Sequence, residues 1–152
     1  MGQPTAEQAL RALEPLVGEW TVELAGPDGQ PWPGRGVSTL EWHPSGAHLV
    51  QRTTVGVPGA PDSTSIIGCD NTAGTYLQLY SDERGVCRIY SMTIDSEQWI
   101  LRRDGEPFPQ RFTAQLSADG NTIAGRWEKD VDGTGFTTDF FLTYHRTAAA
   151  AG

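Results

Sequence analysis

After Gly18, the chain consists of short alternating segments separated by turn residues, and this pattern constrains the fold more than any other feature. Large apolar side chains recur at every second position, which is the period of a β-strand. Links such as HPSG, DNTAG and SADGN carry the Gly, Asn or Asp that tight hairpins need. The pattern therefore predicts ten successive strands: Trp20–Leu24, Arg35–His43, His48–Val57, Thr64–Asp70, Thr75–Ser81, Val86–Ile94, Gln98–Arg103, Gln110–Leu116, Thr122–Lys129 and Phe136–Arg146.

Strands joined by hairpins leave two unpaired edges unless the sheet closes on itself. We therefore expect an all-β, up-and-down antiparallel barrel of about ten strands, which is wide enough for one small ligand. Two longer links, AGPDGQPWPG and VPGAPDS, are candidates for flaps over an opening.

Only Thr5–Leu16 has helical periodicity, with Thr5 as its cap, and we expect this helix to cover one end of the barrel. A chain of 152 residues is long enough for one core. The expected organisation is a single domain over 1–152, with a helix at 5–16, a barrel at 19–146 and a disordered tail at 147–152.

Charge and hydropathy argue against several classes of partner. The net charge is −8, from 19 acidic and 11 basic residues, and it repels nucleic-acid backbones and anionic membrane surfaces. The sequence has no apolar run of about 20 residues. The segment MGQPTAEQALRALEPL lacks the basic and apolar regions of a secretion signal, so we expect a cytoplasmic protein that binds neither nucleic acid nor membrane.

Two motifs carry a family resemblance. LVGEW, with Gly18 and Trp20, resembles the Gly-x-Trp signature that opens lipocalins, fatty-acid-binding proteins and related barrels. FLTYHR resembles their last strand, in which an arginine packs near that tryptophan, and Arg146 is the matching position. Together with RGVCRIYSM, the QRF of the eighth strand and GRWEKDVDG, these motifs make the chain similar to uncharacterised bacterial lipocalin-like proteins of the calycin superfamily. The resemblance implies the fold and carries no activity.

Haem binding is the less favoured reading of this resemblance. In the haem-binding nitrobindin type, glycines follow the tryptophan and a barrel histidine holds the iron, whereas TVEL follows Trp20 here. His145 falls on the face opposite to Phe140, Leu142 and Tyr144. The three histidines have no metal-site spacing, so we expect neither cofactor nor metal.

The candidate ligand-binding residues come from the predicted inward faces. An aromatic wall of Trp42, Tyr90, Trp127 and Tyr144 suits a flat or cyclic ligand, while simple core packing is the alternative. The inward faces of strands three to five are ambiguous. In the third, His48, Val50 and Arg52 compete with Leu49, Gln51 and Val55, and in the fifth, Tyr76, Gln78 and Tyr80 compete with Leu77 and Leu79. The full candidate set is Trp42, Arg88, Tyr90, Met92, Phe112, Trp127 and Tyr144.

Arg88 is the most informative polar candidate, because it shares a predicted inward face with Val86, Tyr90 and Met92. Burying a guanidinium alone costs several kcal/mol. Arg88 must therefore meet an internal acid such as Glu128, carbonyl groups, or a polar or anionic group of a ligand, unless it lies in solvent. Arg103 and Arg111 present weaker forms of the same case.

Three functions remain open at this stage. The first is binding of a small, mostly hydrophobic or aromatic molecule inside the barrel. The second is a barrel enzyme of the cyclase or isomerase type that acts on a lipid-like or natural-product substrate. Glu41 and His43 share a strand face, but a solvated strand end explains them as well, and no catalytic set is assigned. The third is a solidly packed barrel that acts through its surface, for example as a homodimer.

Overall fold

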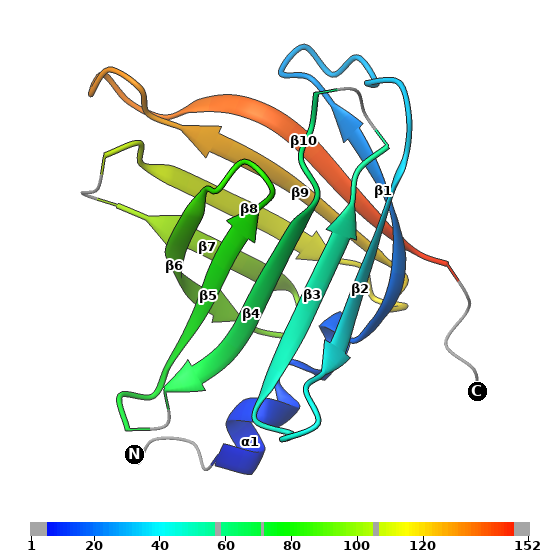
Figure 1. The fold of residues 1–152 in the computed structure, drawn as a ribbon, viewed down its shortest axis with the longest axis vertical. Helices are drawn as coiled ribbons and strands as arrows, with labels where there is room; N and C mark the ends of the chain where they lie inside the picture. The colour runs from blue at the N-terminus through cyan, green and yellow to red at the C-terminus, as the bar shows by residue number, and fades with distance from the viewer. Residues whose placement is uncertain (1–5, 57–58, 71, 105–106, 148–152) are drawn as a thin grey trace.

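Every strand pairs with its neighbours in sequence, and the first strand also pairs with the last, so the sheet closes into a ten-stranded antiparallel barrel (Figure 1). This is a computed structural model, and it describes residues 6–56, 59–70, 72–104 and 107–147. The expected fold class is confirmed. The strands are β1 (Gly18–Ala25), β2 (Gly36–Trp42), β3 (His48–Thr54), β4 (Ser63–Asp70), β5 (Thr75–Asp82), β6 (Cys87–Ile94), β7 (Gln98–Arg103), β8 (Gln110–Leu116), β9 (Thr122–Lys129) and β10 (Thr137–Arg146).

The expected strand bounds agree for β7, β8 and β9 and shift slightly elsewhere. The third strand ends at Thr54 rather than Val57, and Val57 lies outside the described residues. The sixth begins at Cys87, because Val86 belongs to the preceding turn, where its carbonyl accepts the Asp82 N–H.

The N-terminal helix is shorter than predicted: α1 spans Ala6–Arg11 and is followed by a 3₁₀ turn, η1, at Glu14–Leu16. Pro15 has no N–H to donate to the Arg11 carbonyl, so the α-helix cannot continue through it. The proposed cap, Thr5, lies outside the described residues, as does 148–152 of the predicted tail. None of the helices in the described chain is long and apolar enough to cross a bilayer.

The helical segment covers one end of the barrel (Figure 1). Leu13 and Leu16 are completely buried there. The Tyr76 hydroxyl donates to the Ala9 carbonyl at 2.8 Å and ties β5 to α1. We call this the closed end.

The closed end is stabilised by contacts among three residues, Gly18, Trp20 and Arg146. Arg146 Nη1 donates to the Val17 carbonyl at 2.7 Å, and its guanidinium lies 4.1 Å from the Trp20 ring. Gly18 has φ +138°, and a Cβ there would collide with the Arg146 guanidinium, so glycine is required. Trp20 Nε1 donates to the Leu16 carbonyl at 3.0 Å. The arginine thus packs near the tryptophan as the resemblance implied.

The register resolves the ambiguous faces. Leu49 and Gln51 are buried on β3, and Gln78 is buried on β5, whereas Leu77 is 38% exposed. The inward face of β3 thus carries both Leu49 and Gln51, and that of β5 carries Gln78, while Leu77 faces out. Because polar and apolar residues are mixed on these strands, the position of the apolar residues did not reveal the inner face. The apolar residues buried in the core are Ala9, Leu13, Leu16, Trp20, Val22, Leu24, Leu40, Leu49, Ile67, Tyr90, Met92, Trp99, Leu101, Phe112, Ala114, Ile123 and Tyr144.

Candidate functional site

The end of the barrel opposite the helix has inward side chains that keep partial exposure. Trp127 lies opposite Phe140 in the β9–β10 register, and Phe140 and Leu142 alternate on the same face of β10. All three are only partly buried, although Trp99 and Trp20, deeper in the barrel, are 2% and 0% exposed. The described links between β1 and β2, β5 and β6, and β9 and β10 surround this end (Figure 1). We call this end of the barrel the open half and define it by its inward residues, which are Tyr80, Arg88, Arg103, Gln110, Trp127, Phe140 and Leu142.

Aromatic rings form a continuous series from the open half to the closed end. Neighbouring ring centroids lie 5.0–6.5 Å apart, the range in which aromatic pairs attract each other. The series runs Trp32, Phe140, Trp127, Phe112, Trp99, Tyr144 and Trp20. Trp32, Phe140 and Trp127 are the members of the series at the open half, and they are partly exposed. The series therefore presents an apolar wall to the open half.

Trp32 belongs to the long link between β1 and β2 and lies at the mouth. Its backbone N–H donates to the Leu24 carbonyl at 2.9 Å, and its ring contacts Phe140 at 5.6 Å. The side chain is 36% exposed. The link AGPDGQPWPG, the first of the two predicted flaps, therefore packs at the edge of the opening through Trp32.

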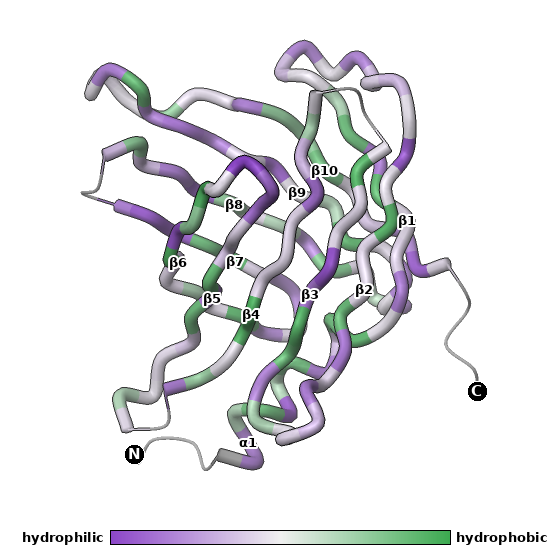
Figure 2. Tube along the Cα trace, in the orientation of Figure 1, coloured by the Kyte–Doolittle hydropathy of each residue, from purple (hydrophilic) through white to green (hydrophobic). Residues whose placement is uncertain are grey.

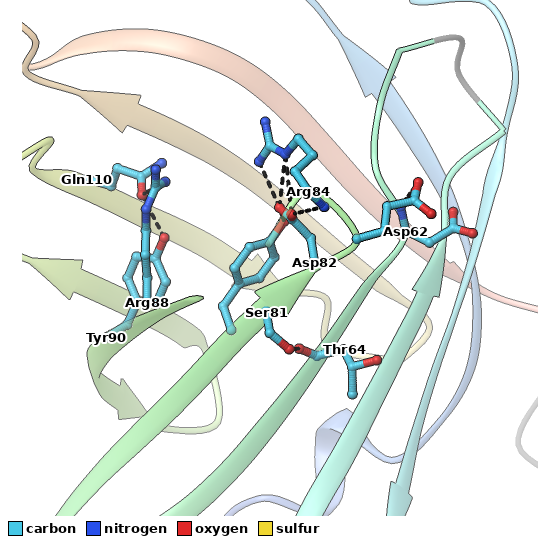
Figure 3. Close-up of polar contacts among 10 residues, drawn as sticks. Asp62, Thr64, Ser81, Asp82, Arg84, Arg88, Tyr90 and Gln110 are labelled. Atoms are coloured by element: carbon cyan, nitrogen blue, oxygen red, sulfur yellow. Dashed lines mark hydrogen bonds and ion pairs between the residues drawn. The ribbon is translucent and has the colours of Figure 1, made fainter. Parts of the chain in front are cut away.

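A hydrogen-bonded group centred on Gln110 lies on the inner wall (Figure 3). Gln110 Oε1 accepts from Arg88 Nη1 at 2.9 Å and from the Tyr90 hydroxyl at 2.6 Å. The Arg88 guanidinium also lies 4.9 Å from the Phe108 ring. Arg88 thus faces inward as predicted, but its protein partner is an amide. Glu128, the acid considered for it, lies 3.8 Å from Arg126 instead.

Arg103 lies next to this group. It follows Trp99 and Leu101 at alternate positions on β7 and pairs in register with Gln110. Its Nε is buried and has no hydrogen-bond partner among the described residues. Burial raises the pKa of Tyr90, while the positive charges of Arg88 and Arg103 act in the opposite direction. Tyr90 therefore stays protonated near neutral pH and donates its hydrogen.

A second polar group lies at the β5–β6 turn, which Figure 2 shows as strongly hydrophilic. Asp82 Oδ2 accepts from the Tyr80 hydroxyl and from Arg84 Nη2, both at 2.7 Å. The hydrogen bonds from Arg84 hold the pKa of Asp82 well below its usual range, and burial raises the pKa of Tyr80 well above its own.

A hollow of about 460 Å³ lies beside this turn, where β3, β4 and β5 end. Thr53, Ser63 and Asp82 form one row of its lining across the three strands, and Arg52, Thr64 and Ser81 form the adjacent, oppositely directed row. The Ser81 hydroxyl donates to the Thr64 carbonyl at 3.2 Å (Figure 3). Because the lining comes from both faces of the sheet, the hollow lies over the rim.

A layer of buried polar side chains crosses the barrel between the two ends. Gln51 Nε2 donates to the Ser38 hydroxyl at 3.0 Å and to the Tyr144 hydroxyl at 3.3 Å. Burial raises the pKa of Tyr144 to about 12. Within the described part of the chain, Gln78 Oε1 and Trp99 Nε1 are buried without a partner. Native proteins usually match such atoms with water or a ligand.

The structure brings together only part of the predicted ligand set. Arg88, Tyr90 and Trp127 meet at the open half, where the Tyr90 and Trp127 rings lie 5.5 Å apart. Phe112 contacts Trp127 but is 1% exposed. Met92 and Tyr144 are also buried, at 4% and 7% exposure, in the packed core.

The structure places two of the residues considered in the sequence, Trp42 and Arg111, away from the inner wall of the open half. Trp42 is the last residue of β2, a strand that runs toward the closed end, and its Nε1 donates to Glu14 Oε1 at 3.0 Å. It therefore lies away from the open half. Arg111 points outward, toward Asp104 at 3.4 Å and over the Phe136 ring at 4.0 Å, because its neighbours Gln110 and Phe112 face inward.

Sequence reasoning missed Gln110 and the contact of Trp32. Gln110 precedes Phe112 by two positions, so the alternation that placed Phe112 inside would have placed Gln110 there too. Nothing local to the sequence indicates that Trp32 folds onto Phe140, which lies far along the chain.

Comparisons with known proteins support the architecture. No protein-family model matches the chain, and no curated protein does either. The crystal structure of Rv2717c from M. tuberculosis has a similar fold, with a TM-score of 0.67 over 92% of this chain and 98% of that one. The sequence identity is 14%, so the likeness concerns the fold alone.

Proposed function

We propose that the open half of the barrel binds a small, mostly apolar molecule with an aromatic or cyclic body. One observation carries this proposal: Trp127, Phe140 and Leu142 face inward and yet remain accessible. In a solidly packed barrel they would be as buried as Trp99. Accessible apolar surface on the inner side of a barrel favours ligand binding, because covering it removes that surface from water.

The polar groups around this surface support the same function. Arg88 and Tyr90 converge on Gln110 beside the Trp127 ring, which combines an apolar wall with a few placed donors. Small-molecule sites generally have this composition, in which the apolar wall provides affinity and the polar groups set orientation.

The enzyme alternative gains no support from the ionisable groups of the open half. General acids and bases work best with pKa values near the operating pH. The pKa of Tyr80 moves up and that of Asp82 moves down, away from neutrality in both cases. Their hydrogen bonds instead fix the β5–β6 turn, so we propose binding rather than catalysis.

Titration with N-phenyl-1-naphthylamine, a neutral apolar dye, tests this proposal. We expect one saturable site and quenching of tryptophan emission. Trp127→Ala should weaken binding by about tenfold, because it removes an aromatic contact and much of the apolar wall. Trp42→Ala is the matched control, because it removes the same side chain at the closed end.

The outcome separates the alternatives, provided that circular dichroism shows each variant to be folded. Saturable binding that is lost in Trp127→Ala and kept in Trp42→Ala supports a site in the open half. Absence of saturable binding would favour a solid barrel that acts through its surface. Equal weakening by both variants would place the dye elsewhere.

A further inference from the structure

The group around Gln110 has more hydrogen-bond donors than acceptors. A carbonyl oxygen has two lone pairs, and Gln110 Oε1 uses both, one for Arg88 and one for Tyr90. A guanidinium has five N–H donors. Arg88 Nη1 donates to Gln110, and the guanidinium also interacts with the Tyr90 hydroxyl, so most of its five donors have no acceptor in the described part of the chain.

Arg103 adds a second guanidinium to the same place. It faces Gln110 across β7 and β8, and its buried Nε has no acceptor among the residues that the structure describes. Both arginines act electrostatically on Tyr90, so the two charges lie near the same hydroxyl. Two like charges in a partly desolvated site repel each other unless an anion joins them.

Scarcity of acids does not explain these unpaired arginines, because the chain has 19 acidic residues against 11 basic ones. Within the described ranges, no carboxylate forms an ion pair with Arg88 or Arg103. Other cations hold the acids around the rim, in the pairs Arg84–Asp82, Arg111–Asp104, Arg126–Glu128 and Lys129–Asp139.

Arg88 is also held in place from the outside. The Phe108 ring lies 4.9 Å from its guanidinium, and Phe108 has φ +61°, the one positive φ among described residues other than glycine. A bulky residue adopts this conformation only where its surroundings impose it. The guanidinium therefore contacts both the Phe108 ring and Gln110, which restricts its position.

We infer that the molecule bound in the open half is an organic anion, with an aromatic or cyclic body against Trp127 and a carboxylate, or a group of like charge and geometry, between Arg88 and Arg103. This inference rests on the proposed binding function and adds the chemical class of the ligand. A planar carboxylate accepts paired N–H donors from guanidinium groups, which is the complement of a site rich in donors.

A pair of dyes tests the inference. 8-Anilinonaphthalene-1-sulfonate has the aromatic frame of N-phenyl-1-naphthylamine plus one anionic group. Arg88→Met and Arg103→Met should each weaken the anionic dye by about tenfold or more, the size expected for a lost charge-assisted hydrogen bond, and change the neutral dye by less than about twofold. Arg102→Met is the matched control, because Arg102 is the neighbouring, exposed arginine of β7, and it should change neither dye.

A second comparison needs no variant. In the wild-type protein, 2-naphthoic acid should displace the neutral dye at a lower concentration than 2-naphthylmethanol does. This advantage should shrink as salt is added, since screening weakens the attraction of a partly exposed charge. An acid that displaces no better than the alcohol would overturn the inference.

Further outcomes separate this inference from the proposed function. If the neutral dye fails to bind the wild-type protein, the proposed function fails. If it binds, but the arginine variants weaken both dyes equally, the assignment of an anion is wrong and the binding function stands. Glu106 lies outside the described residues, and Glu106→Gln should leave the anionic dye unchanged. A gain in affinity would identify Glu106 as an internal counter-ion and contradict the inference.

Discussion

The two ends of the barrel place the same kinds of side chain in opposite situations. At the closed end, Arg146 donates to the carbonyls of Pro15, Val17 and Gly120 and stacks on a fully buried tryptophan. At the open half, Arg88 donates to one neutral amide beside a partly exposed tryptophan. Pro15 and Val17 belong to the helical segment and its end, and Gly120 belongs to the link between β8 and β9. The closed end is thus built for stability, and the open half is where we propose that a ligand binds.

The largest expected effect is on the packing of the closed end. Trp20→Ala should lower the free energy of unfolding by about 3–5 kcal/mol, because it removes a 0% exposed ring and the hydrogen bond to Leu16. Equilibrium denaturation measures this loss. A loss below about 1 kcal/mol would show that the closed end is not the stable half.

Arg146→Met should cost about 2–4 kcal/mol, because the carbonyls of Val17 and Gly120 lose their donor and the cation–π contact with Trp20 disappears. Arg126→Met provides the control, since the Arg126 side chain is 49% exposed and its ion pair is long, at 3.8 Å. That control should change stability by less than about 0.5 kcal/mol. Equal effects would remove the distinction between a structural arginine and a surface one.

Trp127→Ala should lower stability by about 1–2 kcal/mol, less than Trp20→Ala, because part of the Trp127 ring is already exposed to water. The same denaturation experiment measures it. A loss equal to that of Trp20→Ala would indicate that the open half is packed as tightly as the closed end.

The smallest expected effect concerns pH. The pKa of Asp82 is lower in the folded protein than in the unfolded chain. The stabilisation that this carboxylate provides is therefore fully present above its unfolded pKa of about 4, and it is lost as the pH falls through its folded pKa. Asp82→Asn should therefore cost about 1 kcal/mol at pH 7, with the difference from wild type shrinking below about pH 4. A difference that persists at lower pH would mean that Asp82 contributes through packing alone.

Much of the fold was predictable from the sequence, because hairpin barrels depend on local signals. Alternation and turn residues located every strand, and Gly18, Trp20 and Arg146 located the closure. The inner faces of β3 and β5 were ambiguous because the barrel buries Gln51 beside Leu49 on β3, and buries Gln78 on β5 while Leu77 points out. The local sequence pattern shows that side chains alternate between two faces. It does not show which face points into the barrel when both carry polar and apolar residues.

The candidate site was less predictable, because it depends on how far along the barrel axis each residue lies and on contacts between segments that are distant in the sequence. Alternation turned Trp42 and Trp127 to the same side of the sheet, yet one lies at the closed end and the other at the open half. Arg88 was assigned to the inside, but its partner Gln110 comes from β8, and strand β7 lies between them. Such a contact appears only when the three strands pair and the sheet curves.

The five tryptophans allow the central claim to be tested in one measurement. Each indole N–H gives its own signal in a ¹H–¹⁵N correlation spectrum, with Trp20 and Trp42 at the closed end and Trp32 and Trp127 at the open half. Titration with N-phenyl-1-naphthylamine should shift the Trp127 and Trp32 signals and leave those of Trp20 and Trp42 in place. Shifts confined to Trp42, or no saturable shift at all, would contradict a ligand site in the open half.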